Sequence, residues 1–194
     1  SLNYAPVIGL EQAVKNAKAA AEAAARDGKM LLFISERMPP QGQLVVPALL
    51  ATAAIHHHLS DIGLRCDTNL IVETGSARDP HQIACLIGYG ATAVYPYLAY
   101  DVIERMINTN MLHMGSLEAQ KNYRKGINKG LMKIMSKMGI SPISSYRGAQ
   151  LFEIVGLDND VTDLCFPDAR SRIGGATFVH LQHDAEKLAH DAWL

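Results

Sequence analysis

Three short apolar runs, each followed by a segment of helical character, constrain the fold of this chain most strongly. They lie at residues 30–34, 69–72 and 93–95. An apolar run this short is typical of a strand buried on both faces, and its repeated alternation with helices predicts parallel βα units. The helices are expected at residues 10–28, 47–61, 80–87 and 98–109.

The number of these units excludes a complete barrel. An eight-stranded βα barrel needs about 250 residues, and this chain has 194. We predict an α/β fold with an incomplete, TIM-barrel-like parallel βα arrangement and extra C-terminal helices, in a single domain at residues 1–194. The later elements are expected to be a helix at 116–138, a candidate fourth strand at 140–145, short helical turns with a loop at Ser171–Gly175, and a final helix at 183–193.

The composition excludes several classes of protein. Apolar residues make up 48% of the chain and charged residues 19%, which excludes a disordered tail. The formal net charge of −1 excludes a globally basic nucleic-acid-binding protein. The longest apolar run, Pro47–Ile55, is about half of a membrane span, and no signal peptide is visible. Three widely spaced cysteines favour free thiols and a reducing compartment, so we expect a cytoplasmic protein. The charge balance and the short apolar runs lead us to expect no nucleic-acid or membrane partner.

The histidines suggest a metal site only weakly. His56, His57 and His58 are adjacent, and adjacent residues of a helix diverge by about 100°, so the three cannot ligate one metal. His81 and Cys85 share a helix face at i and i+4, which is half of a zinc site without two further ligands. Packing histidines, and no metal, are the favoured interpretation.

Polar residues follow the first two predicted strands, where chemistry gathers in βα folds. They are Ser35-Glu36-Arg37 and Glu73-Thr74-Gly75. Glu73 is a candidate acid or base by position, but no nucleophile accompanies it. Gly88-Tyr89-Gly90 lies between a helix and a strand, the reverse order of a dinucleotide fingerprint, and is read as a tight turn.

A basic stripe runs along the predicted helix at 116–138. Its members are Lys121, Arg124, Lys125, Lys129, Lys133 and Lys137. Tyr123 is the one aromatic residue among them, whereas a base-stacking platform uses several. A solvated or partner-docking face is therefore favoured over a nucleic-acid site, which stays as a third hypothesis.

Several longer strings occur in constant order over residues 29–180. They are Val46–Ala51, Ala54–Leu59, Leu70–Gly75, Leu86–Ala91, Pro96–Ala99, Asn122–Tyr123, Ile127–Leu131, Ile134–Ser141, Ser145–Gln150 and Ser171–Gly175. Together they closely resemble the central domain of glutamate synthase, the segment between the amidotransferase and FMN-binding domains. Ser35-Glu36-Arg37 departs from the family, which usually carries Ser-Asp-Arg followed by a different loop.

The resemblance implies a structural and channelling role. In glutamate synthase, the amidotransferase releases ammonia from glutamine, and a tunnel leads it to the FMN site, where 2-oxoglutarate becomes glutamate. FMN and a 3Fe–4S cluster belong to other parts of the parent enzyme, so no cofactor and no catalytic residue is expected in this segment. The expected partners are the amidotransferase and FMN-binding domains of the same chain.

Six residues are candidate interdomain or tunnel contacts under this hypothesis. They are Arg37, His56, His57, Glu73, Tyr146 and Arg147. The alternative hypothesis is a free-standing α/β enzyme that binds a metal or phosphate through Glu73 and His81.

Overall fold

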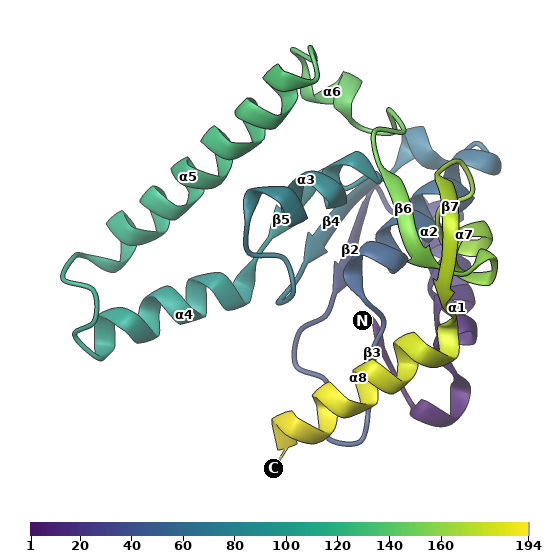
Figure 1. Ribbon diagram of the computed structural model, residues 1–194, viewed down its shortest axis with the longest axis horizontal. Helices are drawn as coiled ribbons and strands as arrows, with labels where there is room; N and C mark the ends of the chain where they lie inside the picture. Colours follow the sequence, from purple (N-terminus) through teal and green to yellow (C-terminus); the bar gives the residue numbers. More distant parts are fainter. Residues whose placement is uncertain (194) are drawn as a thin grey trace.

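A three-stranded parallel sheet in the order β2–β4–β5 forms the centre of the molecule (Figure 1). The computed structural model describes residues 1–193. The strands are β2 (Leu31–Ser35), β4 (Asn69–Glu73) and β5 (Ala93–Tyr95). Leu32 lies opposite Leu70, and Val72 opposite Val94, in an unbroken parallel register. The predicted parallel βα arrangement is therefore confirmed, and the sheet does not close into a barrel.

Three helices build the layer against this sheet. They are α1 (Leu10–Arg26), α2 (Ala48–Asp61) and α3 (Pro80–Gly88). Asp79 caps α3 by accepting a bond from the backbone nitrogen of Gln82, whose side chain accepts from Asp79 in return. Pro80 takes the first helical position, where its missing N–H costs nothing. Helix α2 contacts α1, α3, β2 and β4, and most of its first eight residues are buried.

The sheet is buried on one face only, which corrects the expectation drawn from its apolar runs. Leu32 and Ile34 of β2 are buried, whereas Leu31 and Phe33 expose 56% and 64% of their surfaces. Successive side chains of a strand point to opposite faces. Helix α2 covers the face of Leu32 and Ile34, but no element of residues 1–193 buries Leu31 and Phe33 on the other face.

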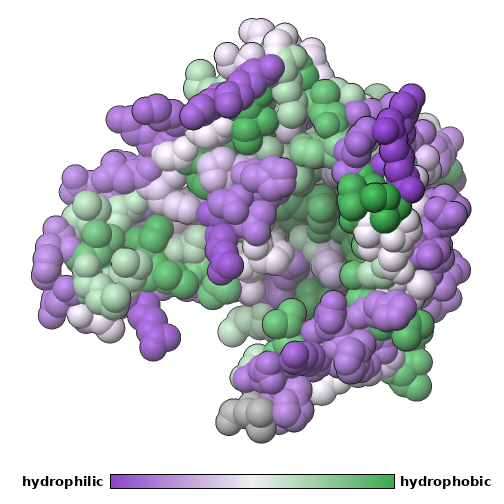
Figure 2. Space-filling model, viewed as in Figure 1, coloured by the Kyte–Doolittle hydropathy of each residue, from purple (hydrophilic) through white to green (hydrophobic). Residues whose placement is uncertain are grey.

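Helices α4 (Tyr97–Asn108) and α5 (Ser116–Lys137) form an arm that extends away from the sheet (Figure 1). Helix α4 buries no residue, and hydrophobic residues lie on the surface of the arm (Figure 2). Helix α5 packs on α3 at Gly130, where a Cβ would lie 2.5 Å from Cβ and Cγ of Pro80. Glycine therefore permits the close approach that anchors the arm.

The C-terminal part differs most from the sequence-based expectation. It contains α6 (Ile143–Tyr146), β6 (Glu153–Leu157), α7 (Asn159–Cys165), β7 (Arg170–Ala176) and α8 (Phe178–Trp193). The candidate strand at 140–145 is wrong, because Pro142 starts a helix there. The loop predicted at Ser171–Gly175 belongs to β7, which pairs parallel with β6. Its glycines hide the strand pattern: a Cβ on Gly175 would lie 2.5 Å from the carbonyl oxygen of Gly156.

Short elements complete the chain. They are β1 (Asn3–Tyr4), the 3-10 turns η1 (Pro6–Ile8) and η2 (Arg65–Asp67), and β3 (Leu44–Val45), which pairs antiparallel with β1. One hydrophobic core runs from the N-terminal segment through α2 and the sheet to Val161 in α7 and Phe178 in α8. Among the described residues, no helix has the length and apolar character needed to cross a membrane.

Candidate functional site

The structure divides the six candidate residues between two places. Arg37 and Glu73 lie at the C-terminal edge of the central sheet. His56, His57 and Tyr146 line a cavity near the opposite edge, and Arg147 directly follows Tyr146 without lining the cavity. In βα barrels, active sites form at the C-terminal edge, whereas residues at the other edge serve stability. The two groups therefore need separate interpretations.

Glu73 is held by its own sheet neighbours at the C-terminal edge. Its Oε2 accepts a 2.6 Å hydrogen bond from Oγ of Ser35 on the adjacent strand. Its Oε1 pairs with the guanidinium of Arg37 at 3.2 Å, and the same guanidinium lies over the ring of Tyr97, 5.3 Å from its centroid. Both carboxylate oxygens thus have partners within the domain.

Glu36 is the residue at this edge that sequence reasoning missed. It is 8% exposed, and its Oε1 accepts from the backbone nitrogen of Ala48 at 2.9 Å. Its Oε2 accepts from Oγ1 of Thr74 at 2.5 Å and from the backbone nitrogen of Gly75 at 2.9 Å. Ser76 adds further bonds through its hydroxyl and backbone nitrogen. The Glu36 carboxylate therefore ties the loop after β2 to the loop after β4. The sequence signal that could have identified it is an acidic residue directly after a buried strand.

The second place is a cavity of about 160 Å³ where the C-terminal ends of α2 and α3 meet α6 and the segment before β6. His56, His57 and Asp61 line it from α2, and Tyr146 lines it from α6. Tyr146 is 1% exposed, and its hydroxyl has no hydrogen-bond partner among the described residues. The Nε of Arg147 is likewise buried without a partner in this part of the chain.

His56 is a neutral packing histidine. Its Nδ1 accepts a 2.9 Å hydrogen bond from Nε of Arg65, which also donates to the carbonyl oxygen of Gly90. Burial lowers the pKa of His56 to about 4, with further lowering by Arg65, His57 and Arg147. Gly90 permits this packing, because a Cβ there would lie 2.4 Å from the imidazole ring. The contact could not be read from the sequence, because Gly90 and Arg65 come from separate turns of the chain.

His57 lies beside two acids. Its Nδ1 is 3.7 Å from Oδ2 of Asp168. Burial lowers the pKa of His57, while Asp168 and Asp61 oppose that effect. The net shift is downward, so His57 is mostly neutral near pH 7, and it leaves the two carboxylates without full charge compensation.

The His81 and Cys85 pair lacks the partners of a metal site. Sγ of Cys85 lies 3.8 Å from Nε2 of His81. Burial raises the pKa of Cys85 to about 11, so its thiol is protonated in the metal-free chain. Within residues 1–193, no three His, Cys, Asp or Glu residues are grouped so as to hold a metal ion.

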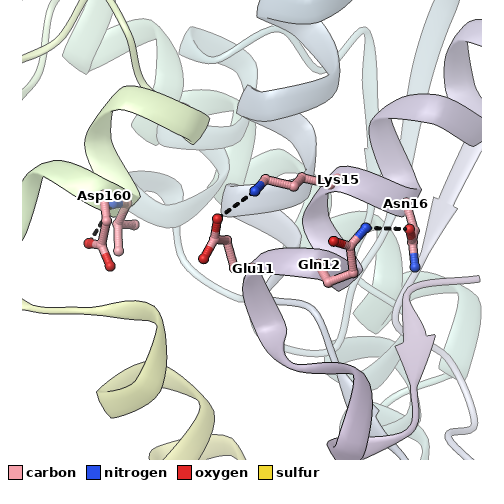
Figure 3. Close-up of polar contacts among 6 residues, drawn as sticks. Glu11, Gln12, Lys15, Asn16 and Asp160 are labelled. Carbon is pink, nitrogen blue, oxygen red and sulfur yellow. Dashed lines mark hydrogen bonds and ion pairs between the residues drawn. The ribbon is translucent and has the colours of Figure 1, made fainter.

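Polar contacts on α1 are of a different kind. Lys15 pairs with Glu11 at 2.5 Å, and Gln12 donates to Asn16 at 3.0 Å (Figure 3). Asp160 accepts from the backbone nitrogen of Val161 at the start of α7. The two exposed pairs on α1 join residues one helical turn apart, and such pairs contribute about 0.2–0.5 kcal/mol each to helix stability. They provide matched surface controls rather than a site.

Comparison with known proteins decides the family. The family described as "Glutamate synthase central domain" matches residues 1–158. The chain belongs to the glutamate synthase central domain family. It is 41% identical over 184 residues to the NADPH-type glutamate synthase large chain of Bacillus subtilis. The alignment covers 95% of this chain and 12% of the Bacillus protein.

Two further glutamate synthases show the same relation of lengths. The NADH-type enzyme of Saccharomyces cerevisiae is 40% identical over 94% of this chain and 9% of its own length. Ferredoxin-dependent glutamate synthase 2 of Arabidopsis thaliana is 44% identical over 85% of this chain and 11% of its own. The chain therefore spans about a tenth of the curated relatives that it matches.

A solved flavocytochrome b2 variant has a related fold. It matches with a TM-score of 0.54 over 68% of this chain and 32% of its own, at 15% sequence identity. This likeness supports the TIM-barrel-like arrangement of the glutamate synthase central domain and carries no information on its chemistry. The open three-stranded sheet corresponds to the predicted incomplete barrel.

The basic stripe of this central domain lies fully on the arm. All six Lys and Arg residues between 121 and 137 are exposed on α5. Within residues 1–193, none of them forms an ion pair with an acid. The six side chains therefore form an exposed basic face of α5.

Proposed function

We propose that this chain is a structural and channelling domain of glutamate synthase, with no catalysis of its own. It links ammonia release at the amidotransferase to the FMN site of the parent enzyme, which we place in the cytoplasm. FMN and the 3Fe–4S cluster belong to other domains of the same polypeptide. The chain's share of about a tenth of its relatives' length supports a role as one part of a larger enzyme.

The commitment of both carboxylates at the C-terminal edge is the observation that carries this proposal. A general acid or base must exchange a proton with a substrate that lies within hydrogen-bond reach. Glu73 is engaged by Ser35 and Arg37, and Glu36 by Ala48 and the loop after β4. These carboxylates order the loops after β2 and β4, which is a structural role rather than a catalytic one.

The cavity beside His56 does not suit FMN. It has a volume of about 160 Å³, and ligands of cofactor size need about 300–1,000 Å³. Asp61 and Asp168 line that cavity and would repel a phosphate.

The open face of the sheet suits a wall of an ammonia route. Leu31 and Phe33 point away from α2 and present apolar surface. Ammonia stays neutral and unable to escape only where water and acids are excluded. An adjoining domain that covers this face would make such a dry surface, with Arg37 and Glu73 at its rim.

The test compares two reactions of a full-length glutamate synthase that carries this domain. We expect Phe33→Asp to lower glutamine-dependent glutamate formation at least fivefold, with glutamine hydrolysis exceeding 2-oxoglutarate consumption. The reaction supplied with saturating external ammonia is expected to stay within twofold of the original rate. Lys15→Ala, on the exposed side of α1, is the matched control.

Two results would contradict the proposal. One is a Phe33→Asp enzyme that keeps glutamine hydrolysis and glutamate formation in their original ratio. The other is glutamine hydrolysis or 2-oxoglutarate reduction by the 194-residue chain alone, measured with reductant and FMN present.

A further inference from the structure

Strand β2 has an open edge on the side away from β4. The backbone nitrogen of Asn69 donates to the carbonyl oxygen of Met30 at 2.8 Å, which sets the register in which the even-numbered residues along β2 bond to β4. The backbone groups of the odd-numbered residues point to the other side, because the groups of a strand alternate in direction. In the part of the chain that the structure describes, the N–H and C=O groups of Leu31 and Phe33 therefore have no hydrogen-bond partner.

One end of this edge already pairs with an extended segment. The backbone nitrogen of Leu2 donates to the carbonyl oxygen of Ser35 at 2.9 Å. Ser35 is the next odd-numbered residue after Phe33, so its carbonyl lies in the same row of outward backbone groups. The edge therefore has the geometry that strand pairing requires, and the pairing stops before it reaches Phe33 and Leu31.

A groove of about 280 Å³ runs beside the open edge, between α1 and β2. Helix α1 lines it with small side chains, which are those of Ala17, Ala20, Ala21 and Ala24. Residues 31–34 of β2 line the other side. A strand paired with β2 would direct every second side chain into this groove, and the alanines leave room for apolar side chains there.

The fold indicates a parallel strand at this position. Helices α2 and α3 each connect two neighbouring parallel strands, β2 to β4 and β4 to β5. Helix α1 packs beside α2 and leads into β2, but no strand of the same sheet precedes it among residues 1–193. In a βα barrel, to which this fold is related, every strand pairs with a parallel neighbour on both sides.

We propose that the open edge of β2 receives a parallel β-strand from another part of the same glutamate synthase polypeptide. This strand pairs with the backbone of Leu31 and Phe33 and places apolar side chains in the groove beside α1. The inference rests on the proposal that the chain is one part of a larger enzyme, and most of that polypeptide lies outside this segment. Such strand addition uses backbone hydrogen bonds for affinity and the groove for specificity.

Backbone hydrogen exchange tests the inference in a full-length glutamate synthase that carries this domain and in the 194-residue chain. An amide exchanges slowly only while it is hydrogen-bonded in a stable structure. The amides of Leu31 and Phe33 should therefore exchange about a hundredfold more slowly in the full-length enzyme than in the 194-residue chain. The amides of Leu32 and Ile34, which face β4, are the internal control and should be protected in both.

A pair of variants on α1 tests the groove itself. Ala20 is exposed and lines the groove, so Ala20→Arg should block the added strand and speed exchange at Phe33 about tenfold in the full-length enzyme. Ala23 is equally exposed but does not line the groove, so Ala23→Arg is the matched control and should leave the exchange unchanged. Thermal unfolding of both 194-residue variants shows whether α1 is intact.

Three results would overturn the inference. The first is equal exchange of Leu31 and Phe33 in the full-length enzyme and the 194-residue chain, and the second is protection that survives Ala20→Arg. The third is protection in the 194-residue chain that grows with its concentration, because a second copy would then occupy the edge. The ratio of glutamine hydrolysis to glutamate formation is measured separately, so a failure of the channelling role is distinguishable from a failure of this inference.

Discussion

The molecule contains two parallel sheets that differ in almost every respect except strand direction. Strands β2, β4 and β5 pair in an unbroken register, and α2 covers the buried side chains on one face of β2 and β4. Strands β6 and β7 pair with two register shifts, and Val155 and Ile173 expose 70% and 60% of their surfaces. Both sheets are paired, but only the first is covered by helices and buries its side chains. We infer that covering helices stabilise a parallel sheet more than strand pairing does.

The largest expected effect compares one side chain from each sheet. Leu70 on β4 is fully buried, so Leu70→Ala should lower the free energy of unfolding by about 2–5 kcal/mol through lost burial and a cavity. Val155→Ala on β6 should change it by less than about 0.5 kcal/mol, as expected for an exposed position. Urea unfolding of both variants measures the contrast. Equal losses would show that the second sheet is covered to the same extent as the first.

The next effect concerns the loops rather than the strands. Glu36→Ala removes a buried carboxylate and leaves the backbone nitrogens of Ala48 and Gly75 without their acceptor, which should cost about 2–3 kcal/mol. Glu153→Ala, on the exposed second sheet, should cost less than about 0.5 kcal/mol. Chemical denaturation gives both values. A small effect at Glu36 would mean that water replaces the carboxylate at this edge.

Two adjacent glycines test how tightly the second sheet is paired. Gly175→Ala places a methyl group 2.5 Å from the carbonyl oxygen of Gly156 and should cost about 1–3 kcal/mol. At Gly174 the nearest atom to such a methyl is 3.7 Å away, so Gly174→Ala is the matched control. Hydrogen exchange of β6 amides reports the local loss. Identical exchange in the two variants would show that the strands separate freely at this point.

The smallest effect lies between the two regions, at His56. Its pKa is about 4 in the folded chain and about 6.5 when unfolded, so the unfolded chain binds the extra proton between these values. The free energy of unfolding should therefore fall as pH decreases from 6.5 to 4, by about 1–2 kcal/mol after allowance for solvent screening. His56→Gln should flatten this part of the stability profile. An unchanged slope in that variant would assign the dependence to other groups.

The first sheet could be predicted because its strands and the helix that follows have clear local sequence signals. The runs at 30–34 and 69–72 are apolar, and Asp79-Pro80 marks the start of the next helix. Which face was covered could not be predicted, because Leu31 and Leu32 are the same residue type and only the packing of α2 distinguishes them. Strand β7 was missed because Gly174 and Gly175 are typical of loops, and only at Gly175 does the close approach of Gly156 require the glycine.

Of the candidate sites, the position of Glu73 could be predicted from the sequence, but the cavity beside His56 and the role of Glu36 could not. Glu73 was expected at the C-terminal edge because it directly follows an apolar run, and the structure places it there with Arg37. The meeting of His56 with Tyr146 depends on how the chain returns after α5, which no local pattern encodes. Glu36 was passed over because its neighbours in the sequence gave no indication of partners nearly forty residues away.

The close contact between Gly130 and Pro80 is a point about which α5 could rotate. Ser116, at the start of α5, lies about 21 Å along the helix axis from Gly130, given about 1.5 Å per residue. A rotation of about 5° at this fulcrum would displace the far end by about 2 Å over that length. A side chain added at Gly130 would therefore clash with Pro80 and, through the length of α5, displace the turn between α4 and α5.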